Sequence, residues 1–320
     1  MASSPLGLPV PPARPGVCAT CHGPARDGHP DCWCCRAVSD ALSRHGPDVA
    51  ARPVVVPVAV FRVGDPLHRV LRGYKDAPAV SARRHFAGRL RTHLADFVAA
   101  HGACMAAAGA GPVDALCVVP SSGRTAVPVA PGRPALLSPG DGVARPLAGV
   151  VEAVATLAGV DRVVLRRGPG RTGHLAPHPE AFEVCGDVGG RRVLLLDDTW
   201  VTGARMRSAG AALVGGGAAA VTMVVAGRAV DVGAGPAVAR WWAWAERRST
   251  DGAGAPPGQP CCLPTCRWRD PSVRVVLPCR PRHEMLGCTK QMPPEMPPWR
   301  RPAPRTAHPP TPPPTSSNAR

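Results

Sequence analysis

Residues 191–204 constrain the fold of this chain more than any other segment. Two arginines are followed by four apolar residues, 193–196, and then by two adjacent aspartates, Asp197 and Asp198. A short loop with threonine and glycine comes next, and a helix-like stretch begins at Ala204. An apolar run without alternation is typical of a strand covered on both faces of a parallel sheet. The segment therefore predicts a buried strand over 191–196, with both carboxylates at its carboxyl end.

Strands and helices alternate along the middle of the chain. Apolar runs predict strands over 54–60, 113–120, 160–165 and 219–225, and helix-like stretches cover 67–76, 80–98, 145–158 and 204–213. Pro57 indicates that the first of these strands lies at an edge or a turn. Residues 166–180 carry glycines and prolines without a period, which predicts a loop. The alternation predicts an α/β fold over residues 50–245, a parallel sheet with flanking helices.

The two ends of the chain differ from its middle. Residues 1–16 are rich in proline and predict a disordered lead-in, whereas residues 17–45 hold a cluster of cysteines. From Pro256 onward the chain has 18 of its 41 prolines, so we expect a disordered tail rich in proline and arginine over 250–320. The composition changes abruptly near Cys266. That change is consistent with a functional tail or with a reading-frame artefact.

Charge and hydropathy limit the partners that the chain can bind. The chain has 38 Lys and Arg against 22 Asp and Glu, which favours a polyanion such as nucleic acid. However, Lys75 and Lys290 are its only lysines, so a GC-rich coding bias explains the arginines equally well. The uncharged window 208–227 is rich in alanine and interrupted by three glycines, which predicts a helix, a turn and a strand, not a membrane span. With no secretory signal visible, we expect a soluble, cytoplasmic protein.

Two Cys-x-x-Cys pairs lie ten residues apart near the N-terminus. Cys18, Cys21, Cys32 and Cys35 have the spacing of a structural tetrahedral Zn²⁺ site. Cys34 is an alternative to Cys32 or Cys35, but the spacing of the first pair favours Cys35; His22 and His29 are further substitutes. Free thiols or a redox pair are the competing interpretation. A redox pair usually follows a strand and opens a helix, an arrangement that we do not expect here. Cys261, Cys262 and Cys266 have no fixed fourth partner and predict unpaired thiols.

The two aspartates and the loop after them predict a site for a sugar phosphate. Asp197 and Asp198 can accept hydrogen bonds from two vicinal ribose hydroxyls. Thr199 and Thr202 offer hydroxyl donors, Gly203 allows close approach of the backbone, and the helix N-terminus favours an anion. Adjacent aspartates after a strand also occur in metal sites of response regulators and in plain strand exits, so the loop is what favours a phosphate.

The run Leu-Leu-Leu-Asp-Asp-Thr-Trp-Val-Thr-Gly-Ala resembles the signature by which type I phosphoribosyltransferases bind phosphoribosyl pyrophosphate (PRPP). The resemblance implies that Asp197 and Asp198 hold the ribose. It assigns the 5-phosphate to the residues of the loop: Thr199, Trp200, Val201, Thr202, Gly203 and Ala204. Val201 stands where a second threonine is common, and Arg205 where another hydroxyl residue is common. The chain is thus a variant of the signature.

The order of cysteine pairs, the stretch Leu-Arg-Gly-Tyr-Lys-Asp at 71–76 and the acidic run resembles the ComF-like branch of this family, over roughly residues 18–230. The branch implies a structural Zn²⁺ and a link to natural competence. The turn Pro-Ser-Ser-Gly-Arg at 120–124 replaces the segment rich in proline and arginine that is more usual there.

Two further segments match the pyrophosphate side of the family's site. The resemblance assigns pyrophosphate contacts to Ser121, Ser122 and Arg124, after the strand over 113–120. It also assigns them to Arg166 and Arg167, in a basic loop like the family's flexible hood. An ordinary turn and a solvated basic loop are the competing interpretations. His174 and His178 are expected to be surface residues.

The resemblance implies a glycosyltransferase that moves a phosphoribosyl group from Mg²⁺–PRPP to an acceptor and releases pyrophosphate. The sequence does not specify the acceptor, and Trp200 is the one clear aromatic platform near the loop. The alternative is a non-catalytic protein that binds nucleotide or single-stranded DNA during DNA uptake. The sequence carries no information on oligomeric state.

Overall fold

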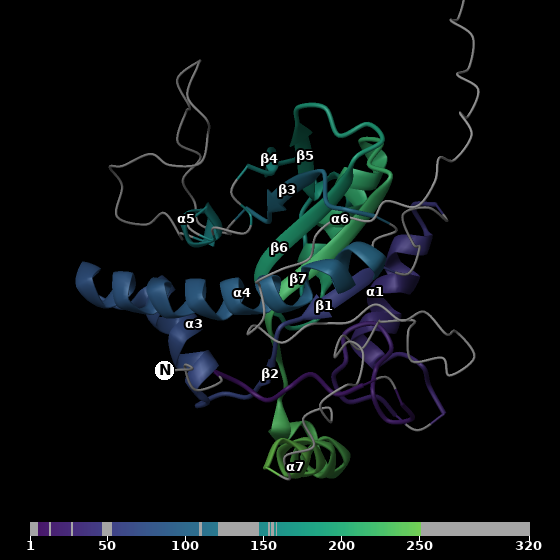
Figure 1. Ribbon diagram of the computed structural model, residues 1–320. Coiled ribbons are helices and arrows are strands. Elements are labelled where there is room, and N and C mark those ends of the chain that lie inside the picture. Colours follow the sequence, from purple (N-terminus) through teal and green to yellow (C-terminus); the bar gives the residue numbers. More distant parts are fainter. Residues whose placement is uncertain are drawn as a thin grey trace, which may run out of the picture. The chain divides into compact units, whose positions relative to one another are not determined.

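Seven strands form one sheet in the order β1-β7-β6-β3-β4-β5, with β2 also paired to β7 (Figure 1). The strands are β1 (Val54–Pro57), β2 (Val60–Phe61), β3 (Ala115–Val118), β4 (Asp161–Arg167), β5 (Phe182–Cys185), β6 (Arg192–Trp200) and β7 (Ala220–Ala229). All pairs are parallel except β4 with β5. The expected α/β class with a mostly parallel sheet is confirmed. The expected position of Pro57 at an edge is also confirmed, because β1 is the first strand of the order.

This computed structural model describes residues 6–12, 14–26, 28–46, 53–108, 111–120, 147–152, 154, 157 and 159–250, all within one unit spanning Met1–Cys279. Ser121, Ser122, Arg124 and the tail from residue 251 onward lie outside the described residues, so the predictions made for them stay predictions.

The helices cover both faces of the sheet. They are α1 (Trp33–Ser43), α3 (Pro66–Asp76), α4 (Val80–Ala108), α5 (Leu147–Glu152), α6 (Ala204–Gly215) and α7 (Pro236–Thr250), with 3-10 turns η2 (Pro179–Ala181) and η3 (Val232–Ala234). Helices α3, α4 and α5 share one apolar cluster with the sheet, and α6 shares another with the sheet and the N-terminal cysteines. α3 and α4 lie against each other on their face (Figure 1).

The central strand β6 explains the unbroken apolar run. Leu194 and Leu196 pack into the cluster under α3 and α4, whereas Val193 and Leu195 pack into the cluster under α6. Successive side chains of a strand point to opposite faces, so a strand covered on both sides needs apolar residues at every position.

The strand that was predicted to end at Leu196 continues through the acidic run. β6 continues to Trp200, and its parallel register with β7 pairs Asp197 with Val225, Thr199 with Gly227 and Trp200 with Arg228. β7 is ten residues long, not seven, so it offers ladder partners well past the aspartates. The loop before α6 therefore has three residues, 201–203, and Thr199 and Trp200 belong to the strand.

Three elements were not predicted. β4 extends through Arg167, and β5 returns antiparallel to it, so the expected loop over 166–180 is shorter than predicted. Helix α7 carries three tryptophans, two of them buried, in a segment for which no helix was predicted. Helix α1 begins directly after Cys32. None of the helices in the described part of the chain combines the length and apolar character that a membrane span requires.

The strand order places a topological switch between β6 and β3. The connection from β3 leads to β4 on one side, whereas the connection from β6 leads to β7 on the other. Ligands of open α/β sheets bind in the crevice at the carboxyl ends of the two strands that flank such a switch. Those ends are Pro120, after β3, and Asp197 and Asp198, in the last part of β6.

Candidate functional site

A pocket of about 190 Å³ lies at the switch between β3 and β6. Its lining residues come from the strand ends and from the helices above them: Tyr74, Lys75, Val118, Val119, Pro120, Leu147, Ala148, Val163, Val164, Leu165, Asp197, Asp198 and Arg205. The pocket therefore combines an acidic pair with two cations and an apolar floor. A site of this kind favours a ligand with both hydroxyl and anionic groups.

Asp198 is held by two neighbouring residues of α3. Tyr74 Oη donates a hydrogen bond to Asp198 Oδ2, and Lys75 Nζ forms an ion pair with the same oxygen. Burial would raise the pKa of Asp198, but the charge of Lys75 and the hydrogen bonds from Lys75, Tyr74 and Thr199 hold that pKa below its usual value. Asp198 is therefore an ionised acceptor at neutral pH. The stretch containing Tyr74 and Lys75 was noted in the sequence, but neither had been predicted to touch the acidic pair.

Asp197 has the opposite electrostatic environment. Burial, and then the negative charge of Asp198, raise its pKa from 3.8 to about 7, against smaller opposing effects of Arg205, the Asp198 backbone N–H and Lys75. Asp197 Oδ1 accepts a hydrogen bond of 2.9 Å from that N–H. Two adjacent carboxyls thus differ in protonation near neutral pH, a feature more common at functional sites than elsewhere.

The raised pKa of Asp197 predicts a pH-dependent stability. Between about pH 4 and about pH 7 the folded chain retains a proton that the unfolded chain releases, so the free energy of unfolding falls as pH rises. Asp197→Asn removes the buried negative charge that Asp197 carries at high pH, which should stabilise the fold by about 1 kcal/mol. We therefore expect Tm to rise relative to wild type by roughly 2–4 °C near pH 8, and by less near pH 5. Thermal unfolding at several pH values measures this difference. The exposed Asp161→Asn serves as the control, and a difference that does not vary with pH would contradict the assignment.

The loop between β6 and α6 is built around Gly203 and Thr202. Gly203 has φ +85°, and a Cβ there would lie 2.2 Å from the Trp200 ring. Glycine is therefore required both by the left-handed backbone and by the indole packed against it. Thr202 is buried, its hydroxyl donating to the His174 carbonyl oxygen, while Val201 is exposed. None of residues 199–204 lines the pocket itself, and of the predicted phosphate loop Thr199, Val201 and Thr202 line a neighbouring groove.

Trp200 has a different place from the one expected of an aromatic platform. Its side chain is 1% exposed and belongs to the apolar cluster beneath α6. Its indole therefore supports the loop from below and cannot stack on a bound molecule.

Arg205 and Arg167 bring positive charge to the β3–β4 side of the site. Arg205 Nη2 donates to the Pro120 carbonyl oxygen and lines the pocket. Burial, and then the nearby charge of Arg205, lower the pKa of Arg167. Two guanidiniums close enough to repel each other favour an anion near them. Arg166 points away on the same strand, is largely exposed, and forms an ion pair of 2.6 Å with Glu183.

A larger groove of about 980 Å³ begins on the other side of Lys75, which lines both cavities. Its walls come from α1, α3, the end of β6 and the segment after β7. Three exposed apolar side chains line it: Trp33 (63%), Val63 (80%) and Val201 (51%). Trp33 is thus the aromatic surface that this part of the molecule offers, although nothing in the sequence separated it from buried tryptophans.

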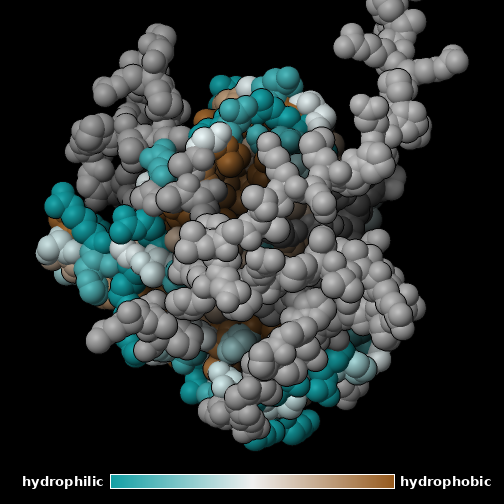
Figure 2. All heavy atoms as spheres, in the orientation of Figure 1, coloured by the Kyte–Doolittle hydropathy of each residue, from teal (hydrophilic) through white to brown (hydrophobic). Residues whose placement is uncertain are grey.

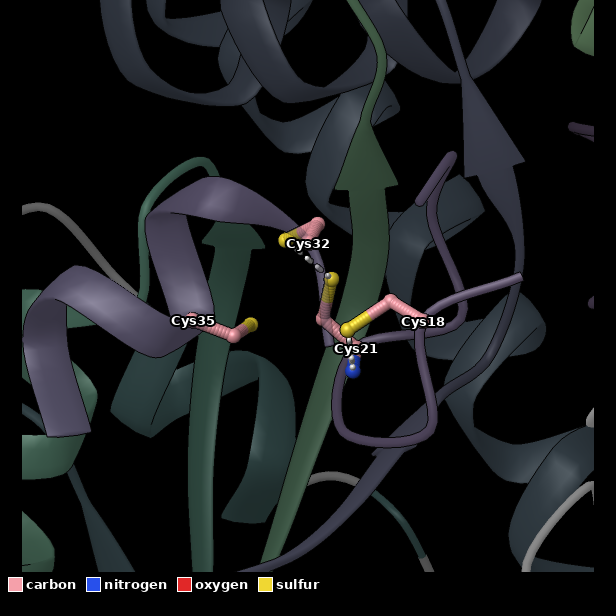
Figure 3. A group of neighbouring side chains, drawn as sticks. All are labelled: Cys18, Cys21, Cys32 and Cys35. Atoms are coloured by element: carbon pink, nitrogen blue, oxygen red, sulfur yellow. Dashed lines mark hydrogen bonds between the residues drawn. The ribbon is translucent and has the colours of Figure 1, made fainter. Parts of the chain in front are cut away.

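The four cysteines of the N-terminal segment converge on one point (Figure 3). Cys18 and Cys21 come from a loop, and Cys32 and Cys35 from the start of α1. Their sulfurs all lie within 4.8 Å of one another, with Cys21 Sγ and Cys32 Sγ 3.8 Å apart. Ligands about 2.3 Å from a tetrahedral zinc are separated by about 3.8 Å, far more than the S–S bond of a disulfide. The cluster is therefore fit to hold a metal such as zinc.

The geometry also decides between the neighbouring cysteines. Cys35 belongs to the buried group of four sulfurs, whereas Cys34 is half-buried and outside it, so the geometry favours Cys35 over Cys34 as the fourth ligand. Contrary to expectation, the second pair does open a helix, because Cys32 is the N-cap of α1. Convergence of all four sulfurs, not the position relative to a helix, is what separates this cluster from a redox pair.

Two buried arginines beside the cysteines escaped the sequence analysis. Arg228 Nε lies 3.3 Å from Cys21 Sγ, and its Nη1 donates to the Trp200 carbonyl oxygen at 3.2 Å. Burial alone would lower the pKa of Arg228, but the charges of Cys21 and Cys32 and the bond to Cys21 raise it. Arg207 Nη1 donates to Ser39 Oγ at 3.1 Å. An arginine within the apolar run 219–230 was the one available signal.

Fold and site together define the class: an α/β protein with a mostly parallel sheet, an acidic pocket at its switch point and a buried four-cysteine cluster. No protein-family model matches the chain, and no curated protein matches it. Among solved structures, phosphoribosylpyrophosphate synthetase from Mycobacterium smegmatis is similar over 46% of this chain and 33% of its own, with 20% sequence identity and a TM-score of 0.23. The match thus spans about a third of that enzyme's length.

Proposed function

We propose that the chain binds PRPP and transfers its phosphoribosyl group to an acceptor with release of pyrophosphate. The observation that carries this proposal is the pair Asp197 and Asp198 at the β6–β3 switch, with Lys75 bound to one of them. Ribose hydroxyls are neutral and need hydrogen-bond acceptors. The ionised Asp198 and the less acidic Asp197 can each accept a hydrogen bond from one of two vicinal hydroxyls. The N-terminus of α6 would receive the 5-phosphate.

Catalysis in this proposal depends on position and charge, not on a nucleophile in the protein. As the bond to pyrophosphate breaks, negative charge grows on the leaving group; Lys75 and Arg205 line the pocket, and Arg167 lies close enough to Arg205 to add positive charge. Mg²⁺ would arrive with PRPP and neutralise part of the same charge. Asp198, kept ionised by Lys75, would fix the ribose while positive charge develops on its ring.

Calorimetric titration of the zinc-loaded protein with Mg²⁺–PRPP tests the proposal. We expect saturable binding at one site per chain, weakened when ribose 5-phosphate replaces PRPP because the pyrophosphate contacts are lost. Absence of any PRPP binding by the wild-type protein would refute the proposed function.

The four-cysteine cluster favours the ComF-like branch over phosphoribosyltransferases in general. In this proposal the metal is a structural Zn²⁺ held by Cys18, Cys21, Cys32 and Cys35, and it takes no part in the transfer. Zinc binding would hold a short, glycine-rich segment folded, because the segment has few apolar residues of its own to stabilise it.

The groove beyond Lys75 is the natural place for the acceptor, because it meets the ribose pocket at that residue. We expect a planar acceptor to stack on Trp33, so Trp33→Ala should weaken its binding by about tenfold or more, as base stacking on an aromatic residue contributes roughly 1–3 kcal/mol. Competition binding with free nucleobases in the presence of PRPP measures the acceptor affinity of each variant, and the exposed Val80→Ala on α4 is the control. Equal affinities in both variants would place the acceptor elsewhere.

A second candidate function, binding of single-stranded DNA, is favoured by the surface of α4. This helix has four arginines and a single acidic residue, Asp96, and hydrophilic side chains cover its outer end in Figure 2. If it binds DNA, replacing the exposed Arg84, Arg89 and Arg91 by glutamine should lower affinity and reduce the slope of log K against log salt by roughly 2, at about 0.7 per lost phosphate contact. A slope that the triple substitution leaves unchanged would exclude α4 as the contact surface.

A further inference from the structure

The two buried arginines lie where a metal-bound cysteine cluster needs them. Arg228, on β7, is 7% exposed, and Arg207, on α6, is 3% exposed. A divalent cation held by four thiolates carries two net negative charges, which are costly to bury without opposite charge nearby. The two guanidiniums supply that charge. Arg228 contacts Cys21 directly, and the charge of Cys35 acts on Arg207.

Arg228 does more than balance charge, because one guanidinium contacts both the cluster and the acidic strand. Its Nε lies 3.3 Å from Cys21 Sγ, and its Nη1 donates to the Trp200 carbonyl oxygen at 3.2 Å. Trp200 and Arg228 are also register partners of β6 and β7. The Trp200 indole in turn packs on Gly203, at the start of α6. Three successive contacts therefore join a ligand sulfur to the loop that follows the aspartates.

We propose that Arg228 is a positioning residue that couples the metal cluster to the end of β6, so that metal occupancy controls the order of residues 197–203. Arg207 also supplies positive charge, but its bond to Ser39 joins α6 to α1, not the cluster to β6. The consequence for PRPP affinity rests on the proposed function, whereas the consequence for the order of β6 does not. The two can therefore be tested separately in one set of proteins.

The test uses the full zinc-loaded chain and the variants Arg228→Met, Arg228→Lys and Arg207→Met. Zinc retention is measured by competition with a chromophoric chelator, and the order of residues 192–203 by hydrogen–deuterium exchange. We expect both methionine variants to lose about 10–100-fold in zinc affinity, as partners of metal ligands commonly do. With zinc bound, only Arg228→Met should exchange faster over 192–203, and chelation of the wild type should produce the same acceleration.

Arg228→Lys keeps the charge but cannot hold Cys21 and Trp200 with one planar group. It should therefore retain zinc nearly as well as wild type and yet exchange faster over 192–203, which separates coupling from charge and from a failure to fold. Unchanged exchange in both Arg228 variants, or in the chelated wild type, would overturn the proposal. If the wild type fails to bind PRPP, the proposed function fails, while the exchange data still decide the coupling.

Discussion

Asp198→Asn should lower the affinity for Mg²⁺–PRPP by about a hundredfold or more. A carboxylate that accepts hydrogen bonds from ribose contributes about 1.5–3 kcal/mol per bond, and each 1.4 kcal/mol is a factor of ten. The substitution also deprives Lys75 of its ion-pair partner, so the ammonium would no longer be held at the junction of the pocket and the groove. Calorimetric titration of both proteins with Mg²⁺–PRPP gives the ratio of affinities.

The matched control for this prediction is Asp161→Asn, the same change at an exposed position whose side chain pairs with Arg191. It should bind PRPP as the wild type does. The double substitution Asp197→Ala with Asp198→Ala should abolish binding. Equal PRPP affinities in wild type and the double variant would mean that the sugar phosphate does not bind at the end of β6.

Cys21→Ser should remove the metal and cause a large loss of stability. Cys21 is buried, contacts Arg228 and shares an apolar cluster with β6 and α6, so loss of the metal would open the cysteine segment and expose part of the main core. Because structural zinc commonly contributes several kcal/mol to folding, and each kcal/mol shifts Tm by roughly 2–4 °C in a domain of this size, we expect Tm to fall by roughly 10 °C or more. Metal analysis should fall from about one zinc per chain to nearly none.

Cys34→Ser is the control that the chain itself provides. Cys34 lies between two cluster members in sequence, but it is half-buried and outside the group of four sulfurs. Its substitution should leave both zinc content and Tm near their wild-type values. Equal losses in Cys34→Ser and Cys21→Ser, or a wild-type protein without tightly bound metal, would contradict the zinc site.

The sequence predicted those parts of the fold in which local pattern and tertiary environment agree. The run 193–196 is apolar at every position because both faces of β6 are covered, and the cysteine spacing matches the convergence of four sulfurs. The α/β class and the presence of a buried central strand followed from those local patterns, and the cysteine spacing favoured Cys35.

The errors arose where a distant partner decides the structure. Asp197 and Asp198 looked like the end of a strand, but pairing with an extended β7 carries β6 to Trp200. Trp200 and Trp33 could not be told apart by sequence, yet one is buried under α6 and the other exposed. Tyr74 and Arg228 reach the site from other elements, over separations that no motif spans. The predicted roles of Ser121, Ser122 and Arg124 stay predictions.

The short strands at the two borders of the sheet have a consequence for solubility. β1 and β5 have four residues each and stand at the ends of the strand order, whereas the nine- and ten-residue strands β6 and β7 lie inside it. A long uncovered border strand is a template for pairing with another chain, and a proline at such a border removes a donor. With Pro57 closing β1, the sheet offers little backbone to a neighbouring molecule. Its most aggregation-prone segments are enclosed by their own fold.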